Sequence, residues 1–191
     1  MKTVTQQHIK SINDKQMKMA ELVISAINES VDALINKDFK NAKRIRSEDK
    51  KINDIRWDIE EDCINLIATH QPVASDLREI IALLNINTEL ERIGDYAAGI
   101  AKIVKLIGDE KLIKPLIDIP KMKDIAVDMI ENAMKAYINH NEKSARMIHS
   151  QDDDIDEIYD KVYLELINYM IEHPEKISQC TYLMWVTHNL E

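Results

Sequence analysis

Apolar residues recur along most of the chain at alternating spacings of three and four, the pattern of amphipathic helices packed in a bundle. Six segments follow this pattern, at about residues 5–37, 38–69, 73–106, 122–139, 142–172 and 175–191. Glycine and proline are scarce, with three glycines and four prolines in 191 residues, which is typical of a mostly helical protein. The pattern therefore predicts an all-α fold of six helices.

The second half of the chain repeats the first at an offset of 103 residues. Residues 36–70 recur at 139–173, with the same order of apolar, serine, aspartate and histidine positions. The period is too long for a solenoid, whose repeats are about 20–50 residues long. It indicates two copies of a small helical domain.

Gly108, Pro115 and Pro120 interrupt the helical pattern between the two copies. Because glycine and proline mark turns and loops, we expect the domain boundary here. The predicted architecture is two tandem antiparallel three-helix bundles, the first at residues 1–108 and the second at residues 115–191.

The formal net charge of −9 argues against nucleic-acid binding, which relies on lysine and arginine to neutralise phosphates. A local basic run at residues 40–51 also contains acidic side chains and is interpreted as a solvated helix face. No glycines are spaced closely enough for a phosphate-binding loop or a dinucleotide-binding turn. Nucleotide catalysis by those routes is excluded.

Apolar runs are far too short to span a bilayer, and residues 1–15 lack the apolar stretch of a signal peptide. Cys63 and Cys180 lie far apart and belong to no paired motif, which is typical of reduced, buried thiols. We therefore expect a cytoplasmic protein without direct membrane insertion.

Carboxylates lie at positions that packing alone does not require. Asn87, Glu91 and Asp95 are four residues apart, so they stack along one flank of the third predicted helix. Two carboxylates one turn apart repel each other unless a cation neutralises them. The second predicted helix carries Asp49 and Asn53 at the same spacing. If these two helices are neighbours, their polar side chains converge on one oxygen-lined site.

All-oxygen ligation suits hard cations such as Mg²⁺, Ca²⁺, Mn²⁺ or Fe³⁺. The repeat places Asp152 and Asp156 at the equivalent positions of the second copy. A solvated acidic stripe, with Arg56 or Arg92 making ordinary surface ion pairs, explains the same spacing. The residues alone leave both interpretations open, and the recurrence in the second copy favours the metal site.

The sequence gives little support for catalysis. None of the six histidines has a glutamate three residues before it, as a di-iron oxidase of the ferritin type requires. Nothing resembles a Ser-His-Asp or Cys-His arrangement. We expect a protein that is not an enzyme, with a metal-dependent hydrolase or oxidase built on the acidic cluster as the less favoured alternative.

Residues 71–78, Gln-Pro-Val-Ala-Ser-Asp-Leu-Arg, and residues 90–97, Leu-Glu-Arg-Ile-Gly-Asp-Tyr-Ala, resemble the signature of the PhoU family of bacterial phosphate-uptake regulators. The resemblance extends over essentially the whole chain. It implies two three-helix bundles that hold metal clusters (Fe, Mn, Mg, Ca or Zn) on motifs of the form Glu/Asp-x-x-x-Asp. It also implies a non-enzymatic role: restraint of the phosphate ABC transporter and of the phosphate-starvation sensor kinase, by contact with the transporter ATPase and the kinase.

The family's metal-binding positions are carried over residue by residue. The metal ligands that the resemblance implies are Glu91, Asp95, Asp49 and Asn53 in the first bundle, and Asp152, Asp156 and Glu191 in the second. The second motif stops at Glu191, where the family pattern continues to an arginine and an aspartate. Any bound metal is therefore expected to favour the first bundle.

The last predicted helix is much shorter than the third, so part of the apolar seam of the second bundle is expected to lie uncovered. Either the chain is incomplete, or a partner chain completes this helix. An exposed apolar groove is also a natural site for self-association, and we expect a homodimer. A metal-free helical adaptor of a phosphate permease is retained as a further alternative function.

Overall fold

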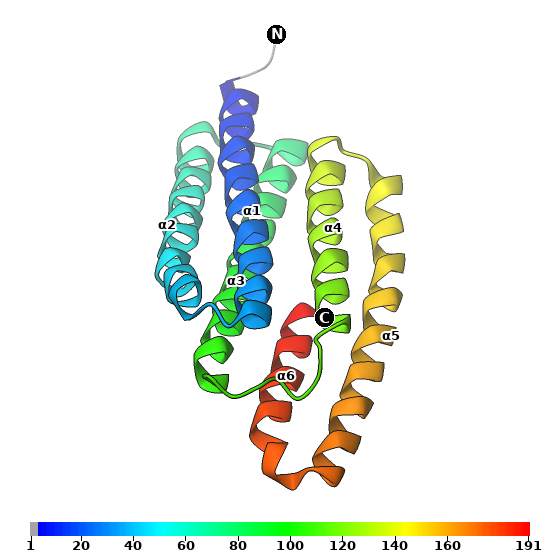
Figure 1. Cartoon of the computed structure of the whole chain (residues 1–191). Coiled ribbons are helices and arrows are strands. Elements are labelled where there is room, and N and C mark those ends of the chain that lie inside the picture. The colour runs from blue at the N-terminus through cyan, green and yellow to red at the C-terminus, as the bar shows by residue number, and fades with distance from the viewer. Residues whose placement is uncertain (1–3) are drawn as a thin grey trace.

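The computed structural model describes residues 4–191 and is built from helices (Figure 1). The elements are α1 (Val4–Asn36), α2 (Phe39–His70), α3 (Ala74–Ile107), α4 (Asp118–Ile138), α5 (Glu142–Glu172), a 3₁₀ turn η1 (Pro174–Lys176) and α6 (Ile177–Leu190). The prediction of an all-α fold with six α-helices in two three-helix bundles is confirmed. The domain bounds of residues 1–108 and 115–191 stay a prediction.

The duplicated halves begin their second helices in the same way. The carboxylate of Asp38 accepts a hydrogen bond from the backbone N–H of Asn41 at 2.9 Å, just before α2. The side-chain oxygen of Asn141 accepts one from the N–H of Ser144 at 3.0 Å, just before α5. A polar residue before the first turn satisfies a backbone donor that has no partner within the helix. The local sequence thus sets the start of both long helices.

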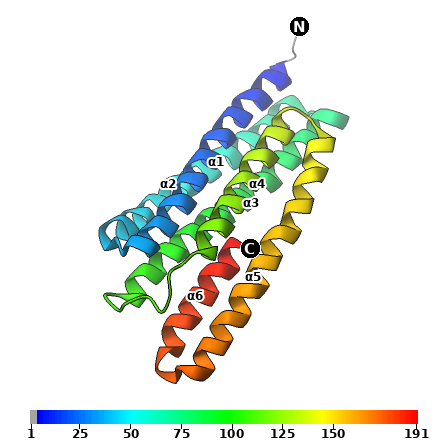
Figure 2. The same cartoon turned by 45° about the vertical axis from the view of Figure 1, so that its right-hand side comes forward.

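The fourth helix begins four residues earlier than the apolar pattern predicts, at Asp118 instead of residue 122. Pro120 was assigned to the connection, but it lies in the first turn of α4, where the backbone N–H of a helix has no partner to lose. The spacing of apolar residues along α4 predicts that Ala133 faces the core, but Ala133 is exposed, because no third helix of its bundle lies over this part of α4 (Figure 2).

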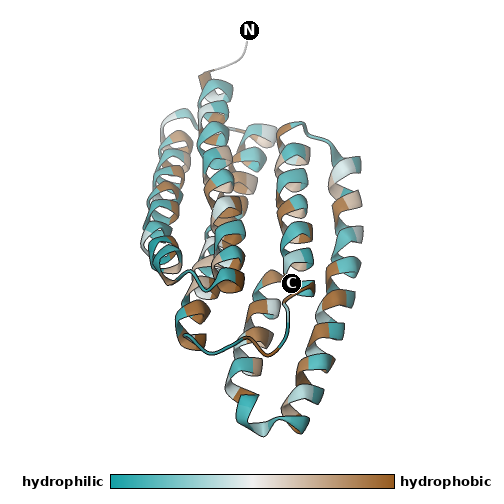
Figure 3. Ribbon diagram, in the orientation of Figure 1, coloured by the Kyte–Doolittle hydropathy of each residue, from teal (hydrophilic) through white to brown (hydrophobic). Residues whose placement is uncertain are grey.

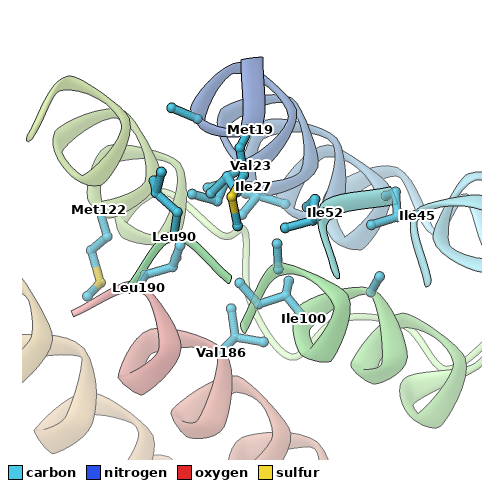
Figure 4. Close-up of a cluster of buried hydrophobic side chains, with 14 of the residues drawn as sticks. Met19, Val23, Ile27, Ile45, Ile52, Leu90, Ile100, Met122, Val186 and Leu190 are labelled. Carbon is cyan, nitrogen blue, oxygen red and sulfur yellow. The ribbon is translucent and has the colours of Figure 1, made fainter. Parts of the chain in front are cut away.

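The two bundles share one apolar core. Helices α1, α2 and α3 pack together, α4 packs on α5, and the bundles join where α4 lies against α1 and α6 lies against α3. Figure 4 shows Leu90 of α3, Leu190 of α6 and Met122 of α4 in this shared core, and all three are buried. Figure 3 shows polar and apolar residues alternating along each helix, the pattern from which the bundle was predicted. Within residues 4–191, no helix is long and apolar enough to cross a membrane.

The link between α3 and α4 is fixed to both bundles. The side chain of Gln179 in α6 is buried, and its oxygen accepts a hydrogen bond from the backbone N–H of Ile113 at 2.7 Å. Its amide nitrogen donates to the carbonyl oxygen of Lys111 at 3.2 Å. The ammonium group of Lys37, at the end of α1, donates to the carbonyl oxygen of Asp109 at 3.2 Å. These bonds hold the connection against the ends of α1 and α6.

Helix α6 ends partway along α4 and α5 (Figure 2). Its 14 residues compare with 34 in α3, its counterpart in the first bundle. The upper part of the α4–α5 pair in Figure 1 therefore lacks the third helix that the first bundle has along its whole length.

Candidate metal centre

Helices α2 and α3 pack closely where the predicted carboxylates lie. A Cβ atom added at Gly94 of α3 would stand 3.0 Å from Cδ1 of Ile52 in α2 and 3.8 Å from Oδ1 of Asp49. A contact at 3.0 Å is tighter than nearly all real Cβ contacts, so a larger residue at position 94 would require the side chain of Ile52 to move by a few tenths of an ångström. The glycine thus lets the carboxylates of the two helices come together.

Asp49 is the central group of this cluster. It is half-buried; its Oδ2 accepts a hydrogen bond from the side-chain amide of Asn53 at 3.2 Å, and its Oδ1 is buried without a partner. Burial raises the pKa of Asp49, and the negative charges of Asp95 and Glu91 raise it further, against the lowering effect of the Asn53 hydrogen bond. The structure therefore brings together the four first-bundle residues that the sequence singled out.

The basic residues nearby are engaged elsewhere. Arg56 pairs with Glu60 at 3.1 Å, and Arg92 pairs with Glu89, both within their own helices. These are the surface ion pairs that the acidic-stripe interpretation expected, but they leave the cluster itself unneutralised. Between residues 4 and 191, no ion pair of 4.0 Å or less involves the three cluster carboxylates.

The row along α3 runs from the core to solvent. Asn87, at its inner end, is buried, and its amide nitrogen donates to the backbone carbonyl oxygen of Arg56 in α2 at 2.9 Å. Glu91 is half-buried, and Asp95 is exposed. The position of this row beside the apolar stripe predicts three half-buried side chains, but only Glu91 is half-buried. Asn87 serves as a bridge between the two helix backbones.

The four side chains offer carboxylate and amide oxygens, which are the ligand atoms that hard cations prefer. In the described part of the chain, however, no three His, Cys, Asp or Glu side chains are already grouped around one point. Cation binding at this site requires Glu91 and Asp95 to turn toward the unpartnered oxygen of Asp49. Both side chains reach solvent and are free to do so.

The second-bundle residues are not brought together in the same way. The carboxylate of Glu191 lies 3.2 Å from Nδ1 of His188. Burial raises the pKa of Tyr159 in α5, and the charge of Glu191 raises it further. Asp156 is exposed, and Asp152 lines a depression between α4 and α5. The prediction of a second metal site stays a prediction, with less structural support than the first.

The sequence pattern assigned no role to Gly94, which leaves room in α3 for the side chain of Ile52 of α2. The available signal was a glycine inside a strongly helical pattern, which marks a close backbone approach or a packing need. The same reasoning gave no role to Gln179, because its two backbone partners lie more than 60 residues away.

Together these features define an all-helical protein of two duplicated three-helix bundles, with an acidic cluster on the seam between its second and third helices. Residues 17–104 and 119–191 match the family model of the PhoU domain, and the chain belongs to this family.

Curated relatives and solved structures agree with this assignment. The phosphate-specific transport system accessory protein PhoU homolog of Aquifex aeolicus is 32% identical over 183 residues, covering 96% of this chain and 83% of that protein. The protein of the same name from Clostridium acetobutylicum is 34% identical over 184 residues, covering 96% of this chain and 84% of that protein. The crystal structure of PhoU from Pseudomonas aeruginosa matches with a TM-score of 0.92 at 28% identity, covering 97% of this chain and 89% of that one.

Proposed function

We propose that this chain is a metal-binding regulator of phosphate uptake that acts through protein contacts and not through catalysis. Its partners are the ATPase of the phosphate ABC transporter and the phosphate-starvation sensor kinase, and its place is the cytoplasm. The names of its relatives support a role in phosphate transport, since they are called phosphate-specific transport system accessory proteins. We also propose that it works as a homodimer.

The observation that carries the metal proposal is the uncompensated charge at the α2–α3 seam. Three carboxylates repel one another there, one oxygen of Asp49 is buried without a hydrogen bond, and the nearest arginines pair elsewhere. A buried polar oxygen without a partner costs about 1–3 kcal/mol. A bound cation supplies the positive charge that the cluster lacks. Asp49 and Asn53 would hold it from α2, and Glu91 and Asp95 from α3.

This arrangement gives the cluster a mechanical role. Repulsion among Asp49, Glu91 and Asp95 opposes the close packing of α2 against α3. With their charge neutralised, the two helices are held together as one rigid face. A partner protein that docks on this acidic face then meets a surface whose shape and charge depend on metal occupancy.

The experiment measures metal content and stability in matched variants. The protein is stripped with a chelator and reloaded separately with Fe, Mn, Mg, Ca or Zn, and the metal is counted by elemental analysis. We expect Glu91→Ala/Asp95→Ala to lose the metal. The control Asp54→Ala/Asp58→Ala removes an exposed acidic pair of the same spacing from α2 and should retain it.

Metal binding should also stabilise the fold. At a free metal concentration one hundred times Kd, a ligand that binds only the native state adds about 2.7 kcal/mol. For a chain of this length, that corresponds to a rise in Tm of roughly 5–11 °C. Unchanged metal content in Glu91→Ala/Asp95→Ala, or an equal loss in the Asp54→Ala/Asp58→Ala control, would contradict the assignment of this site.

A metal-free adaptor is the second candidate function, and the absence of a ready-formed group of three ligands within residues 4–191 favours it. It predicts that purified protein holds no metal and that none of the five metals raises Tm. The regulatory role is tested separately, by expressing the chain in a bacterium that lacks its own relative and measuring uptake of labelled phosphate. Unrestrained uptake would count against regulation whether or not metal binds.

A further inference from the structure

We propose that His8 of α1 and His70 of α2 form a two-histidine site for a borderline transition-metal ion such as Zn²⁺, which ties the start of α1 to the end of α2. The two rings lie next to each other, with their centres 5.0 Å apart and their planes at 55°. His70 follows Asp49 by 21 residues on α2, which is roughly 30 Å along the helix axis. The site is therefore separate from the acidic cluster, and it does not depend on the function proposed above.

The register of α1 against α2 places the two histidines side by side. These helices are antiparallel neighbours, so the start of α1 lies beside the end of α2 (Figure 1). Further into the bundle, Nζ of Lys15 pairs with Oδ2 of Asp62 at 2.6 Å. His8 lies seven residues before Lys15. His70 lies eight residues after Asp62. Both intervals are about two helical turns, so the ion pair and the ring pair lie along the same seam between the helices.

The hydrogen bond of His8 fixes which of its ring nitrogens is free. Nδ1 of His8 lies 3.0 Å from the backbone carbonyl oxygen of Val4, one turn earlier in α1. A carbonyl oxygen can only accept a hydrogen bond, so Nδ1 carries the hydrogen. In a neutral imidazole the other nitrogen then has the free lone pair. Nε2 of His8 is therefore available as a metal ligand.

The same nitrogen is free in His70. Nδ1 of His70 lies 2.7 Å from Oγ1 of Thr69. This hydroxyl group has one hydrogen, and it donates that hydrogen to the backbone carbonyl oxygen of Asn65 at 2.7 Å. Oγ1 of Thr69 must therefore accept from Nδ1 of His70, which leaves the lone pair on Nε2. A hydrogen bond from the non-ligating nitrogen to an oxygen is the usual arrangement of a metal-binding histidine.

The separation of the rings fits a shared metal ion. Zn–N bonds are about 2.0–2.1 Å long, so two imidazoles on one tetrahedral ion have ring centres about 5 Å apart. Imidazole nitrogen suits Zn²⁺, Ni²⁺ and Cu²⁺, whereas Mg²⁺ and Ca²⁺ prefer oxygen. Among residues 4–191, no third His, Cys, Asp or Glu side chain completes the group. Both rings are exposed, so the remaining positions of the ion are open to water.

The second copy of the repeat contains a matched control. His173 is the counterpart of His70, at the same offset of 103 residues. Its ring stacks on that of Tyr169 with the centres 4.4 Å apart, and its Nδ1 lies 3.6 Å from the carboxylate of Glu175. In the described part of the chain, no second histidine ring packs on it. His173 therefore tests whether one exposed histidine at a helix end is enough to bind the ion.

The test titrates the metal-stripped full chain with Zn²⁺ in a calorimeter. Because the acidic cluster offers a second cation site, each titration is made in the wild type and in Glu91→Ala/Asp95→Ala, where the ion on the two histidines should remain. We expect His8→Gln and His70→Gln each to weaken the binding of one Zn²⁺ at least tenfold in both backgrounds. His173→Gln should leave its Kd unchanged. Circular dichroism confirms that each variant remains folded.

Two further measurements address the ring nitrogens and the tie between the helices. In ¹⁵N NMR spectra of metal-free protein, at a pH where the rings are neutral, both His8 and His70 should carry the hydrogen on Nδ1. Zn²⁺ should shift the Nε2 signals of both rings and slow hydrogen exchange in residues 8–13, whereas Mg²⁺ should do neither.

Three results would overturn the proposal. The first is a hydrogen on Nε2 of either ring in the neutral, metal-free protein. The second is Zn²⁺ binding that His8→Gln or His70→Gln leaves as tight as in the wild type, or that His173→Gln weakens equally. The third is Zn²⁺ binding that does not slow hydrogen exchange in residues 8–13, because the ion would then not join α1 to α2.

Discussion

The joint between the bundles makes a sharp prediction at Gly99. A Cβ atom at this position would stand 2.5 Å from Cη2 and 2.9 Å from Cζ3 of Trp185. Carbon atoms pack at about 3.5–4.0 Å, so in Gly99→Ala the indole must retreat by roughly 1 Å, which moves α6 or turns the ring out of the joint. Overpacking of this kind costs about 1–3 kcal/mol, and a 2.5 Å approach places Gly99→Ala in the upper half of that range.

An opposing contribution comes from helix propensity, since alanine is favoured over glycine inside a helix by about 1 kcal/mol. The net expectation for Gly99→Ala is a loss of about 1–2 kcal/mol in the free energy of unfolding. Urea denaturation measures it directly. With a slope near 2 kcal/mol per molar, the midpoint should fall by roughly 0.5–1 M at constant slope.

The decisive control is the same substitution in a Trp185→Leu background. Without the indole, the added methyl group loses its three nearest contacts, so Gly99→Ala should gain stability by about 0.5–1 kcal/mol from helix propensity. The effect of Gly99→Ala on the free energy of unfolding should therefore change sign when Trp185 is replaced by leucine. A double-mutant cycle measures this coupling. Equal effects in the two backgrounds would refute the packing argument.

Two further predictions concern the acidic cluster and the linker. Burial and two neighbouring carboxylates raise the pKa of Asp49 above its unfolded value, so its ionised form destabilises the fold, and stability is gained as pH falls through the folded pKa. In metal-free protein, Asp49→Asn should raise Tm at neutral pH and make Tm depend less on pH. The control Asp54→Asn should do neither. A lower Tm in Asp49→Asn would contradict this prediction. Gln179→Ala leaves the N–H of Ile113 without its acceptor and should cost about 1–3 kcal/mol. Unchanged hydrogen exchange at Ile113 would show that Gln179 does not hold the linker.

Most of the helical architecture follows from the sequence because it depends on local patterns. Alternating apolar spacings fix which face of each helix is buried, and the capping residues Asp38 and Asn141 fix two helix starts. The start of α4 was predicted too late because Pro120 acts as a first-turn residue and not as a breaker. The sequence alone does not separate the two roles, because they differ only in the position of the proline relative to the helix start: in the first turn its missing N–H costs no hydrogen bond.

The acidic cluster was predictable in part. The spacing of four places Glu91 and Asp95 on one face, and adjacency of α2 and α3 brings Asp49 to them. The lack of a hydrogen-bond partner for Oδ1 of Asp49 depends on the packing of α2 against α3, where Gly94 lies next to Ile52. The sequence pattern does not encode this contact. The contact between Gly99 and Trp185 joins separate bundles, so no local periodicity encodes it. Metal binding itself stays a prediction.

The duplication shows what one structural element, the second half of α3, contributes to the acidic cluster. In the first bundle this segment covers α2 and brings Gly94 within 3.8 Å, measured from an added Cβ atom, of Asp49. In the second bundle the counterpart carboxylate, Asp152, lines the depression between α4 and α5. Asp49 and Asp152 are both half-buried, but only Asp49 has two further carboxylates, Glu91 and Asp95, acting on it from a neighbouring helix.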